Sequence, residues 1–229
     1  MITKDRHIEL IATKNEVEIS GYRSVYFKRP ADFVFESGDW IDINFEGREL
    51  NGGITYSISS SPTESDIRIT FREGISEFKK ALQSIEFNDR LFISQYGNDY
   101  DFRLKANQPS VLIAGGVGIA PFRSMIKEMY DNNDKNEVSL IYLSQSSDFL
   151  FKAELDSWVA NMPNASVTYI STKDINRKKR EKLLLSLIAS PHQNFYISGP
   201  PGMVESNEHL LIDYGVQIRN IRIDSFGGY

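Results

Sequence analysis

The chain has 229 residues, of which 41% are hydrophobic and 25% are charged, a composition typical of a folded protein and not of a disordered or collagen-like one. Lys and Arg number 26 against 31 Asp and Glu, so the formal net charge is -5 and general binding to nucleic acid lacks its usual electrostatic basis. There is no cysteine, which excludes disulfides, thiolate zinc sites and Cys-ligated iron–sulfur clusters. Redox chemistry would therefore need a borrowed cofactor.

The sequence carries no targeting or membrane signal that we can identify. The first seven residues are polar, without the apolar core of a secretory signal, and no apolar run approaches the length of a membrane span. We therefore expect a cytoplasmic protein with no membrane span.

The first part of the chain, up to about residue 105, alternates apolar and polar residues with a period of two. The alternation is clearest at residues 41–45 and 67–72, and it predicts antiparallel strands with one face in water. Further strands are predicted at residues 17–27, 54–60 and 90–94, and one helix at residues 76–85 with Ser76 as its N-cap. We expect residues 1–106 to form a small antiparallel β-barrel or sandwich.

From Val111 onward the pattern changes to short apolar strands alternating with helices. Strands are predicted at residues 111–114, 138–143, 167–170, 195–198 and 218–223, and helices are predicted to begin near Pro121, Phe149, Arg180 and Pro201. Five strands joined by four crossovers predict a parallel α/β sheet. We place this second domain at residues 107–229.

A glycine-rich turn follows the first of these strands. Gly115, Gly116 and Gly118 lie between a buried strand and a predicted helix that starts with Ile119 and Pro121. In such a turn the backbone N–H groups and the positive end of the helix can contact a pyrophosphate without interference from Cβ atoms. The alternative is that the glycines serve tight packing. Pro121 stands where the ordinary dinucleotide fingerprint has Gly or Ala.

Two further motifs indicate ligand contacts. In the first domain, Tyr56, Ser57 and Ser59 offer an aromatic face and hydroxyls to a flat ligand with a polar edge, and a second cluster follows the next strand, namely Arg72, Gly74, Ile75 and Ser76. In the second domain, a strand ends in Ser198, Gly199 and Pro200, followed by Met203, at the sheet edge where α/β folds bind ligands. Alone, each motif also fits an ordinary strand edge or strand-to-helix connection.

Taken in their order along the chain, the three motifs resemble those of the ferredoxin-NADP reductase family of flavoenzymes. The resemblance covers nearly the whole chain. The resemblance implies an FAD-binding β-barrel followed by an NAD(P)H-binding α/β domain, with hydride passing from nicotinamide to flavin. It implies that Tyr56 stacks on the isoalloxazine and that Ser57 hydrogen-bonds near its reactive nitrogen. The remaining cofactor-binding positions that it implies are Ser59, Arg72, Gly74, Ile75 and Ser76 for FAD, and Gly115, Gly116, Gly118, Ile119, Pro121, Gly199, Pro200 and Met203 for the nucleotide.

The chain ends in Asp224-Ser225-Phe226-Gly227-Gly228-Tyr229, similar to the acidic residue and terminal Gly-Tyr of stand-alone members of this family. The resemblance implies that Asp224 lies near the flavin, that Tyr229 covers its ring, and that no domain is fused behind it. Ser198 stands where the family usually has Cys before Gly-Pro. Ser57, Ser198 and Asp224 are our candidate catalytic residues, and the alternative for Tyr229 is a frayed terminal residue.

The sequence departs from the family pattern at the flavin motif, where Ile54 occupies the position of an arginine. A guanidinium for the pyrophosphate would have to come from Arg72 or Arg48. The choice between NADH and NADPH is open, because the residues after the second α/β strand, 144–147, are neither basic nor acidic. The basic run at residues 178–180 could contact a 2′-phosphate or could be a solvated helix start.

We therefore expect a monomeric FAD-dependent oxidoreductase. It would take hydride from NADH or NADPH and pass electrons to an external acceptor such as a ferredoxin, a flavodoxin or a haem or oxygenase component. The alternatives are a degenerate, non-catalytic nucleotide-binding module and a reductase of free flavin or ferric chelates.

Overall fold

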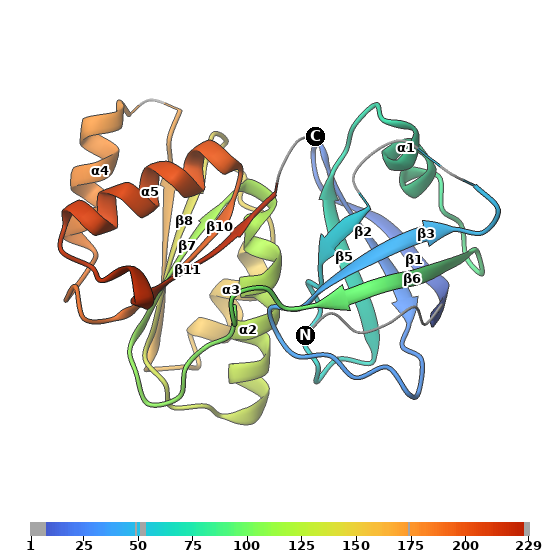
Figure 1. Ribbon diagram of the computed structural model, residues 1–229, viewed down its shortest axis with the longest axis horizontal. Helices are drawn as coiled ribbons and strands as arrows, with labels where there is room; N and C mark the ends of the chain where they lie inside the picture. The colour runs from blue at the N-terminus through green and yellow to red at the C-terminus, as the bar shows by residue number, and fades with distance from the viewer. Residues whose placement is uncertain (1–7, 49, 51–53, 174, 227–229) are drawn as a thin grey trace. The chain divides into compact units, whose positions relative to one another are not determined.

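The computed structural model describes all residues except 1–7, 49, 51–53, 174 and 227–229 (Figure 1). The chain divides into two compact units. Among the described residues, unit 1 contains those up to Asp99 together with Ala120–Glu128, and unit 2 contains Tyr100–Ile119 and those from Met129 onward.

Unit 1 is built on a six-stranded antiparallel sheet in the order β4-β3-β6-β1-β2-β5. A bridge between Ile58 and Ile69 joins the segment after β4 to β5, so the two edge strands meet and the sheet closes into a barrel. The strands are β1 (Ile8–Ile19), β2 (Tyr22–Lys28), β3 (Trp40–Phe45), β4 (Thr55–Ser57), β5 (Asp66–Arg72) and β6 (Arg90–Gly97). This confirms the predicted antiparallel domain.

The structure corrects two strand predictions in this unit. The strand expected at residues 17–27 is two strands, because Gly21 has φ +80 and turns the chain between β1 and β2. The strand expected at residues 54–60 is shorter, since only Thr55–Ser57 pair regularly with β3. Within the described residues β1 begins at Ile8, whereas the sequence analysis predicted a strand only from residue 17. The burial along β1 does not alternate regularly, so the period-two pattern did not reveal its first part.

Helix α1 (Glu77–Gln83) packs against the barrel as expected. The Ser76 side chain accepts a hydrogen bond from the Lys79 amide, which confirms Ser76 as the N-cap. Phe78 and Leu82 are buried on the helix face that meets the barrel core. At the other end the Asn15 amide donates to the Ile85 carbonyl at 2.8 Å and so ties the end of the helix to β1.

Unit 2 is built on a five-stranded parallel sheet in the order β11-β10-β7-β8-β9 (Figure 1). Every residue of β7 and β10 is buried, as expected for central strands covered on both faces. Its elements, with α2 continuing into unit 1, are β7 (Ser110–Gly115), α2 (Ile119–Asn132), β8 (Val138–Ser144), α3 (Lys152–Val159), β9 (Ala165–Ser171), α4 (Arg177–Ser186), β10 (Asn194–Gly199), α5 (Pro201–Asp213) and β11 (Ile221–Ser225). The predicted parallel α/β sheet is confirmed.

Several predicted boundaries shift in unit 2, each for a local reason. Helix α3 begins at Lys152 and not near Phe149, because Phe151 has a left-handed backbone that precedes the helix. Helix α4 begins at Arg177 and not near Arg180, because the Asn176 side chain caps it by accepting from the Lys179 amide at 2.9 Å. Helix α2 begins two residues before Pro121, which leaves that proline in the first turn, where no N–H is needed.

At the other end of the sheet, the strand predicted at residues 218–223 is divided. A short 3-10 turn occupies Ile218–Asn220, and β11 follows at Ile221–Ser225. Within the described residues, no helix is both long enough and apolar enough to cross a membrane.

The turn between β7 and α2 packs closely against the end of β10. A Cβ atom built on Gly118 would lie 2.1 Å from the carbonyl oxygen of Ser198, and one built on Gly115 would lie 2.4 Å from Cε of Met203. Gly199 has φ +152, and its Cβ would also lie 2.4 Å from that Met203 Cε. The tight-packing alternative for this motif is therefore correct for Gly118, whose neighbour is backbone and cannot move aside.

We expect Gly118→Ala to lower the free energy of unfolding by about 3 kcal/mol, because the added methyl group forces the turn away from β10. Gly202→Ala is the matched control. A Cβ there would meet nothing within 4 Å, so its effect should stay below about 1 kcal/mol. Urea unfolding of both variants measures the difference, and equal stability of the two variants would contradict the close packing.

A tyrosine on the barrel is held in its neutral form. Burial raises the pKa of Tyr26, and so does the hydrogen bond that its hydroxyl donates to Glu16 at 2.7 Å, although the positive charge of Arg68 opposes the shift. Because the folded pKa lies above the unfolded one, the stabilising contribution is complete below about pH 10 and is lost as the pH rises further.

We therefore expect the wild-type protein to lose more stability than Tyr26→Phe between about pH 9 and pH 11. Chemical denaturation at several pH values measures this difference. Tyr100→Phe, at an 81% exposed position, is the control and should follow the wild type. Parallel stability curves for wild type and Tyr26→Phe would contradict the assignment.

Candidate functional site

The predicted stacking residue Tyr56 lies in the barrel core. It is 7% exposed, and its ring lies nearly parallel to that of Phe78, with centroids 6.3 Å apart. Phe71 approaches the same ring edge-on at 6.1 Å. One face of Tyr56 is therefore occupied by α1, so a flat ligand has at most the rest of the ring to contact.

Ser57 follows on the next position of β4 and is 6% exposed. Its partner across the strand pair is Trp40, whose indole N–H is buried without an acceptor among the described residues. A buried donor without an acceptor is uncommon in proteins. The register of β3 with β4 brings Trp40 opposite Ser57.

Ser59 has partners within the protein. Its hydroxyl is fully buried, donates to the Arg68 carbonyl at 3.0 Å and shares a hydrogen bond of 2.9 Å with Thr70. Thr70 in turn lies 2.7 Å from the hydroxyl of Ser24. The structure thus places Ser59 in a polar network inside the barrel, where it orders the chain after Ser57.

The predicted phosphate-binding residues form a cationic cluster at the start of α1. Arg72 is exposed at the end of β5, Ile75 is 89% exposed, and Gly74 and Ser76 are half-buried. Lys79 reaches back over this turn, since a Cβ on Gly74 would lie 2.7 Å from its Cδ. Burial lowers the pKa of Lys79, and the nearby charge of Arg72 lowers it further.

This cluster fits the diphosphate of a dinucleotide such as FAD. The charge of Arg72 disfavours the charged form of Lys79, and an anion bound near Lys79 would relieve this repulsion. Ile54, at the position of the family arginine, packs its side chain against the barrel core. The cations near this turn are Arg72 and Lys79, of which the sequence analysis identified only Arg72, and both could hold a diphosphate.

In unit 2 the glycine-rich turn presents half-exposed backbone. Gly116 has φ +56, a conformation that favours glycine, and it and Val117 are half-buried. The Gly116 carbonyl accepts a hydrogen bond from the buried Tyr142 hydroxyl at 2.9 Å, which fixes the turn over β8. Ile119 and Pro121 are both buried, so they act in packing and do not offer surface to a ligand.

Two of the candidate catalytic residues are neighbours in unit 2. Ser198 and Asp224 pair across β10 and β11, and the buried Ser198 hydroxyl donates to Oδ2 of Asp224 at 3.3 Å. Gly199 accepts a hydrogen bond from the Phe226 amide at 3.1 Å, so the end of the chain follows the end of β10. Pro200 is exposed and Met203 half-buried at the start of α5. Tyr229 lies outside the described residues.

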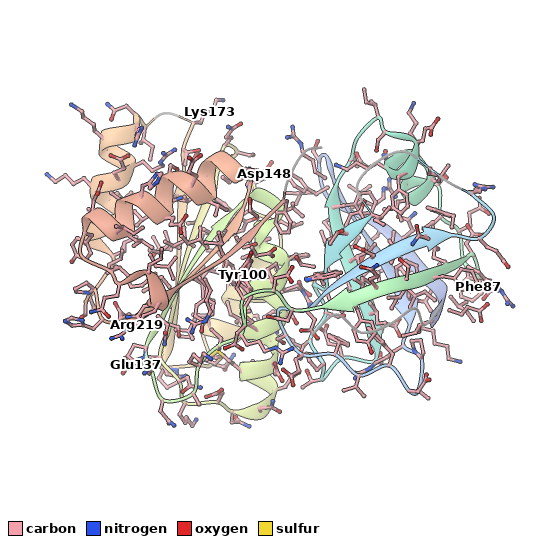
Figure 2. All side chains as sticks on the ribbon, in the orientation of Figure 1. Phe87, Tyr100, Glu137, Asp148, Lys173 and Arg219 are labelled. Atoms are coloured by element: carbon pink, nitrogen blue, oxygen red, sulfur yellow. The ribbon has the colours of Figure 1, made fainter. Side chains whose placement is uncertain are left out.

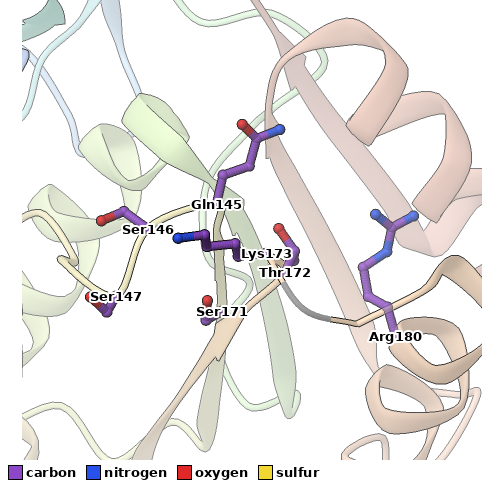
Figure 3. A pocket seen from close by; sticks show the side chains of 7 residues that line it. All are labelled: Gln145, Ser146, Ser147, Ser171, Thr172, Lys173 and Arg180. Carbon is purple, nitrogen blue, oxygen red and sulfur yellow. The ribbon is translucent and has the colours of Figure 1, made fainter.

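A cavity of about 790 Å³ opens at the carboxyl ends of β8 and β9 (Figure 3). Its polar lining includes Lys173, which follows β9 and projects at the surface (Figure 2), and Arg180 on α4. The other lining residues are Gln145, Ser146, Ser147, Ser171 and Thr172. Hydroxyls, an amide and two cations, with no carboxylate among them, suit a phosphate group. The sequence indicated Arg180 for this purpose but missed Lys173, which stands in the loop between β9 and α4.

Residues 112–209 match the model of the oxidoreductase NAD-binding domain. The flavohemoprotein of Bacillus thuringiensis subsp. konkukian is 25% identical over 206 residues, which cover 82% of this chain and 51% of that protein. The toluate 1,2-dioxygenase electron transfer component of Pseudomonas putida is 24% identical over 203 residues, which cover 84% of this chain and 59% of that protein. The chain thus spans about half the length of the flavohemoproteins that it matches.

Among solved structures, the ferredoxin-NADP+ reductase of Neisseria gonorrhoeae, determined with bound FAD and NADP, superimposes with a TM-score of 0.78. The match covers 95% of this chain and 98% of that one at 19% identity. The resemblance indicated by the sequence motifs is confirmed. Residues 112–209 are an oxidoreductase NAD-binding domain, and the chain has the fold of the ferredoxin-NADP reductase-like flavoprotein reductases.

Proposed function

We propose that this protein is an FAD-dependent reductase that takes a hydride from NAD(P)H and passes electrons to a separate acceptor. The observation that carries the proposal is the oxidoreductase NAD-binding domain of residues 112–209 in a chain whose barrel offers a cationic diphosphate site at Arg72 and Lys79. The solved relative with FAD and NADP bound has the same fold and supports the same pair of ligands. We assign residues 1–106 to FAD and residues 107–229 to the nucleotide.

Unit 1 would bind the flavin through Arg72, Lys79 and the backbone around Ser76, which neutralise and orient the diphosphate. FAD, when bound, supplies the ring system that accepts the hydride. The Ser57 hydroxyl, 6% exposed at the end of β4, would orient that ring through a hydrogen bond. Because Ile54 provides no guanidinium, the affinity for FAD depends on these other groups.

Unit 2 would hold the nucleotide over the turn at Gly116 and Val117, where the residues are half-buried and backbone N–H groups could contact a phosphate. Ser198, with its hydroxyl directed at Asp224, would line the nicotinamide position. Asp224 keeps the Ser198 hydroxyl in one orientation, and this fixed polar pair would help to set the angle of the nicotinamide ring.

The relatives support the acceptor class that we propose. One relative is a flavohemoprotein and another is the electron transfer component of a dioxygenase, so the proposed acceptors are a haem group or an oxygenase component, with a ferredoxin or flavodoxin as further members of the class. A reductase of free flavin is the second candidate, and the apolar Ile54 favours it because it weakens the diphosphate site.

The first experiment is a visible spectrum of the purified protein with FAD, followed by anaerobic addition of NADH or NADPH. We expect flavin absorbance that is bleached by one of the two nucleotides. Ser57→Ala should bind FAD but slow its reduction by about tenfold, because the ring loses one orienting hydrogen bond. Stopped-flow absorbance gives the rate constant at saturating nucleotide.

Ser84→Ala, which removes an exposed hydroxyl at the end of α1, is the control and should be reduced like the wild type. Protein that retains no flavin after gel filtration, yet reduces added flavin, would favour the free-flavin reductase. Protein that binds no flavin and oxidises no nucleotide would refute both and leave the non-catalytic module.

We propose further that NADPH is the preferred donor, because the cavity beside α4 combines Lys173 and Arg180 with several hydroxyls, a suitable environment for a 2′-phosphate. Arg180→Gln should raise the KM for NADPH by about tenfold and that for NADH by less than about twofold, since only NADPH carries the phosphate. Steady-state kinetics with both nucleotides measures this. Lys178→Gln, exposed on the same helix and outside the cavity, is the matched control, and equal increases for both nucleotides in Arg180→Gln would contradict the assignment.

A further inference from the structure

A buried guanidinium on α2 contacts the chain segment that follows Ser57. The Arg123 side chain is 2% exposed and belongs to unit 1. Its Nη1 donates to the Ser59 carbonyl at 2.9 Å and to Oε2 of Glu64 at 2.7 Å, and its Nη2 donates to Oε1 of Glu64 at 3.1 Å. One arginine therefore binds a backbone carbonyl and both oxygens of a carboxylate.

The next residue of α2 binds the next carbonyl of the same segment. The fully buried hydroxyl of Ser124 donates to the Ser60 carbonyl at 2.7 Å and lies 2.9 Å from the hydroxyl of Ser37. Glu64 completes the arrangement by accepting from the Ser61 amide at 2.7 Å. The carbonyls of residues 59 and 60 and the amide of residue 61 thus all have partners on α2 or on the carboxylate that Arg123 binds.

The opposite side of this segment is attached to the barrel. The amides of Ser59 and Ser60 both donate to the Arg68 carbonyl, at 2.8 Å and 3.4 Å, and the Ile58 amide donates to the Asp39 carbonyl at 2.9 Å. Strand β4 itself pairs with β3 through only three residues, Thr55–Ser57. The position of Ser57 therefore depends strongly on the clamped segment that comes directly after it.

A buried ion pair such as Arg123–Glu64 fixes the geometry of the groups that it contacts more reliably than it stabilises the fold. The desolvation of both charges offsets much of their attraction, so well-packed apolar side chains would stabilise the fold as well or better. The planar guanidinium instead fixes direction, because two of its N–H groups bind the carboxylate in parallel while another reaches the carbonyl. A role in positioning accounts for this arrangement better than a role in stability does.

We propose that Arg123 is a positioning residue for the flavin site: together with Glu64 and Ser124, it sets the place of Ser57 and Tyr56 by holding residues 59–61. This inference rests on the proposed function, since it concerns the segment that would contact the flavin ring. It adds residues of α2 to a site that the sequence motifs confine to the barrel.

The test is the variant Arg123→Lys, which keeps the charge but loses the fork that binds Glu64 and the Ser59 carbonyl together. In the purified protein without added cofactor, amide hydrogen exchange at residues 57–61 should become at least about tenfold faster, because the segment opens locally. With FAD bound, the rate constant for flavin reduction at saturating nucleotide should fall by about tenfold, while the nucleotide Kd changes by less than about twofold.

Arg23→Lys is the matched control. Arg23 lies in the same unit, its side chain is 21% exposed, and it donates to Glu73 and to Asn15, both at 3.1 Å and both outside residues 57–61. This variant should lose stability yet keep its reduction rate within about twofold of the wild type. If Arg123→Lys does not fold, Ser124→Ala provides the same test, because it removes only the donor to the Ser60 carbonyl and should slow reduction to a smaller degree.

Unchanged exchange at residues 57–61 in Arg123→Lys, or a reduction rate equal to that of Arg23→Lys, overturns the positioning role. A wild-type protein that binds no flavin overturns the proposed function, and the positioning role with it. Because the wild-type spectrum is recorded first, the two failures are distinguished.

Discussion

The turn that follows β7 lies so close to the end of β10 that only glycine fits at its last position. With a Cβ on Gly118 only 2.1 Å from the Ser198 carbonyl oxygen, the first turn of α2 and the carboxyl end of β10 must approach backbone to backbone. That approach brings Ser198, Gly199 and the half-exposed Gly116 backbone to one edge of the parallel sheet. The proposed nucleotide site consists of these groups, so its existence depends on the close packing.

The glycine-rich turn therefore serves close packing, and we propose that it also gives access to a ligand. Gly118 is fully committed to its contact with β10, whereas Gly116 has a positive φ and remains partly exposed. Tight packing is thus observed at Gly118, while anion binding is the role that we propose for the backbone at Gly116 and Val117. A mutation at Gly118 consequently tests the fold, and contacts with the nucleotide are better examined at the cavity of Lys173 and Arg180.

The cations of the barrel unit also divide between a proposed ligand site and a buried contact within the protein. The cations that we propose for a flavin diphosphate are Arg72 and Lys79, on separate elements, since Ile54 is apolar and packs against the core. A further cation, Arg123, is buried with Glu64 and contacts the backbone next to Ser57. In our proposal, two of these three cations offer charge to an anion, while the third orders the chain beside the predicted flavin contact.

The sequence by itself determined the change from antiparallel to parallel sheet, the N-cap at Ser76 and the position of the glycine-rich turn, because strand periodicity, capping and turn chemistry depend on neighbouring residues. It did not reveal the division at Gly21 or the burial of Tyr56 against Phe78. Lys173 beside Arg180 and Arg123 beside Glu64 were equally out of its reach. Only the tertiary structure decided these features, because they depend on how the sheets close and the helices pack, which the pattern of neighbouring residues does not specify.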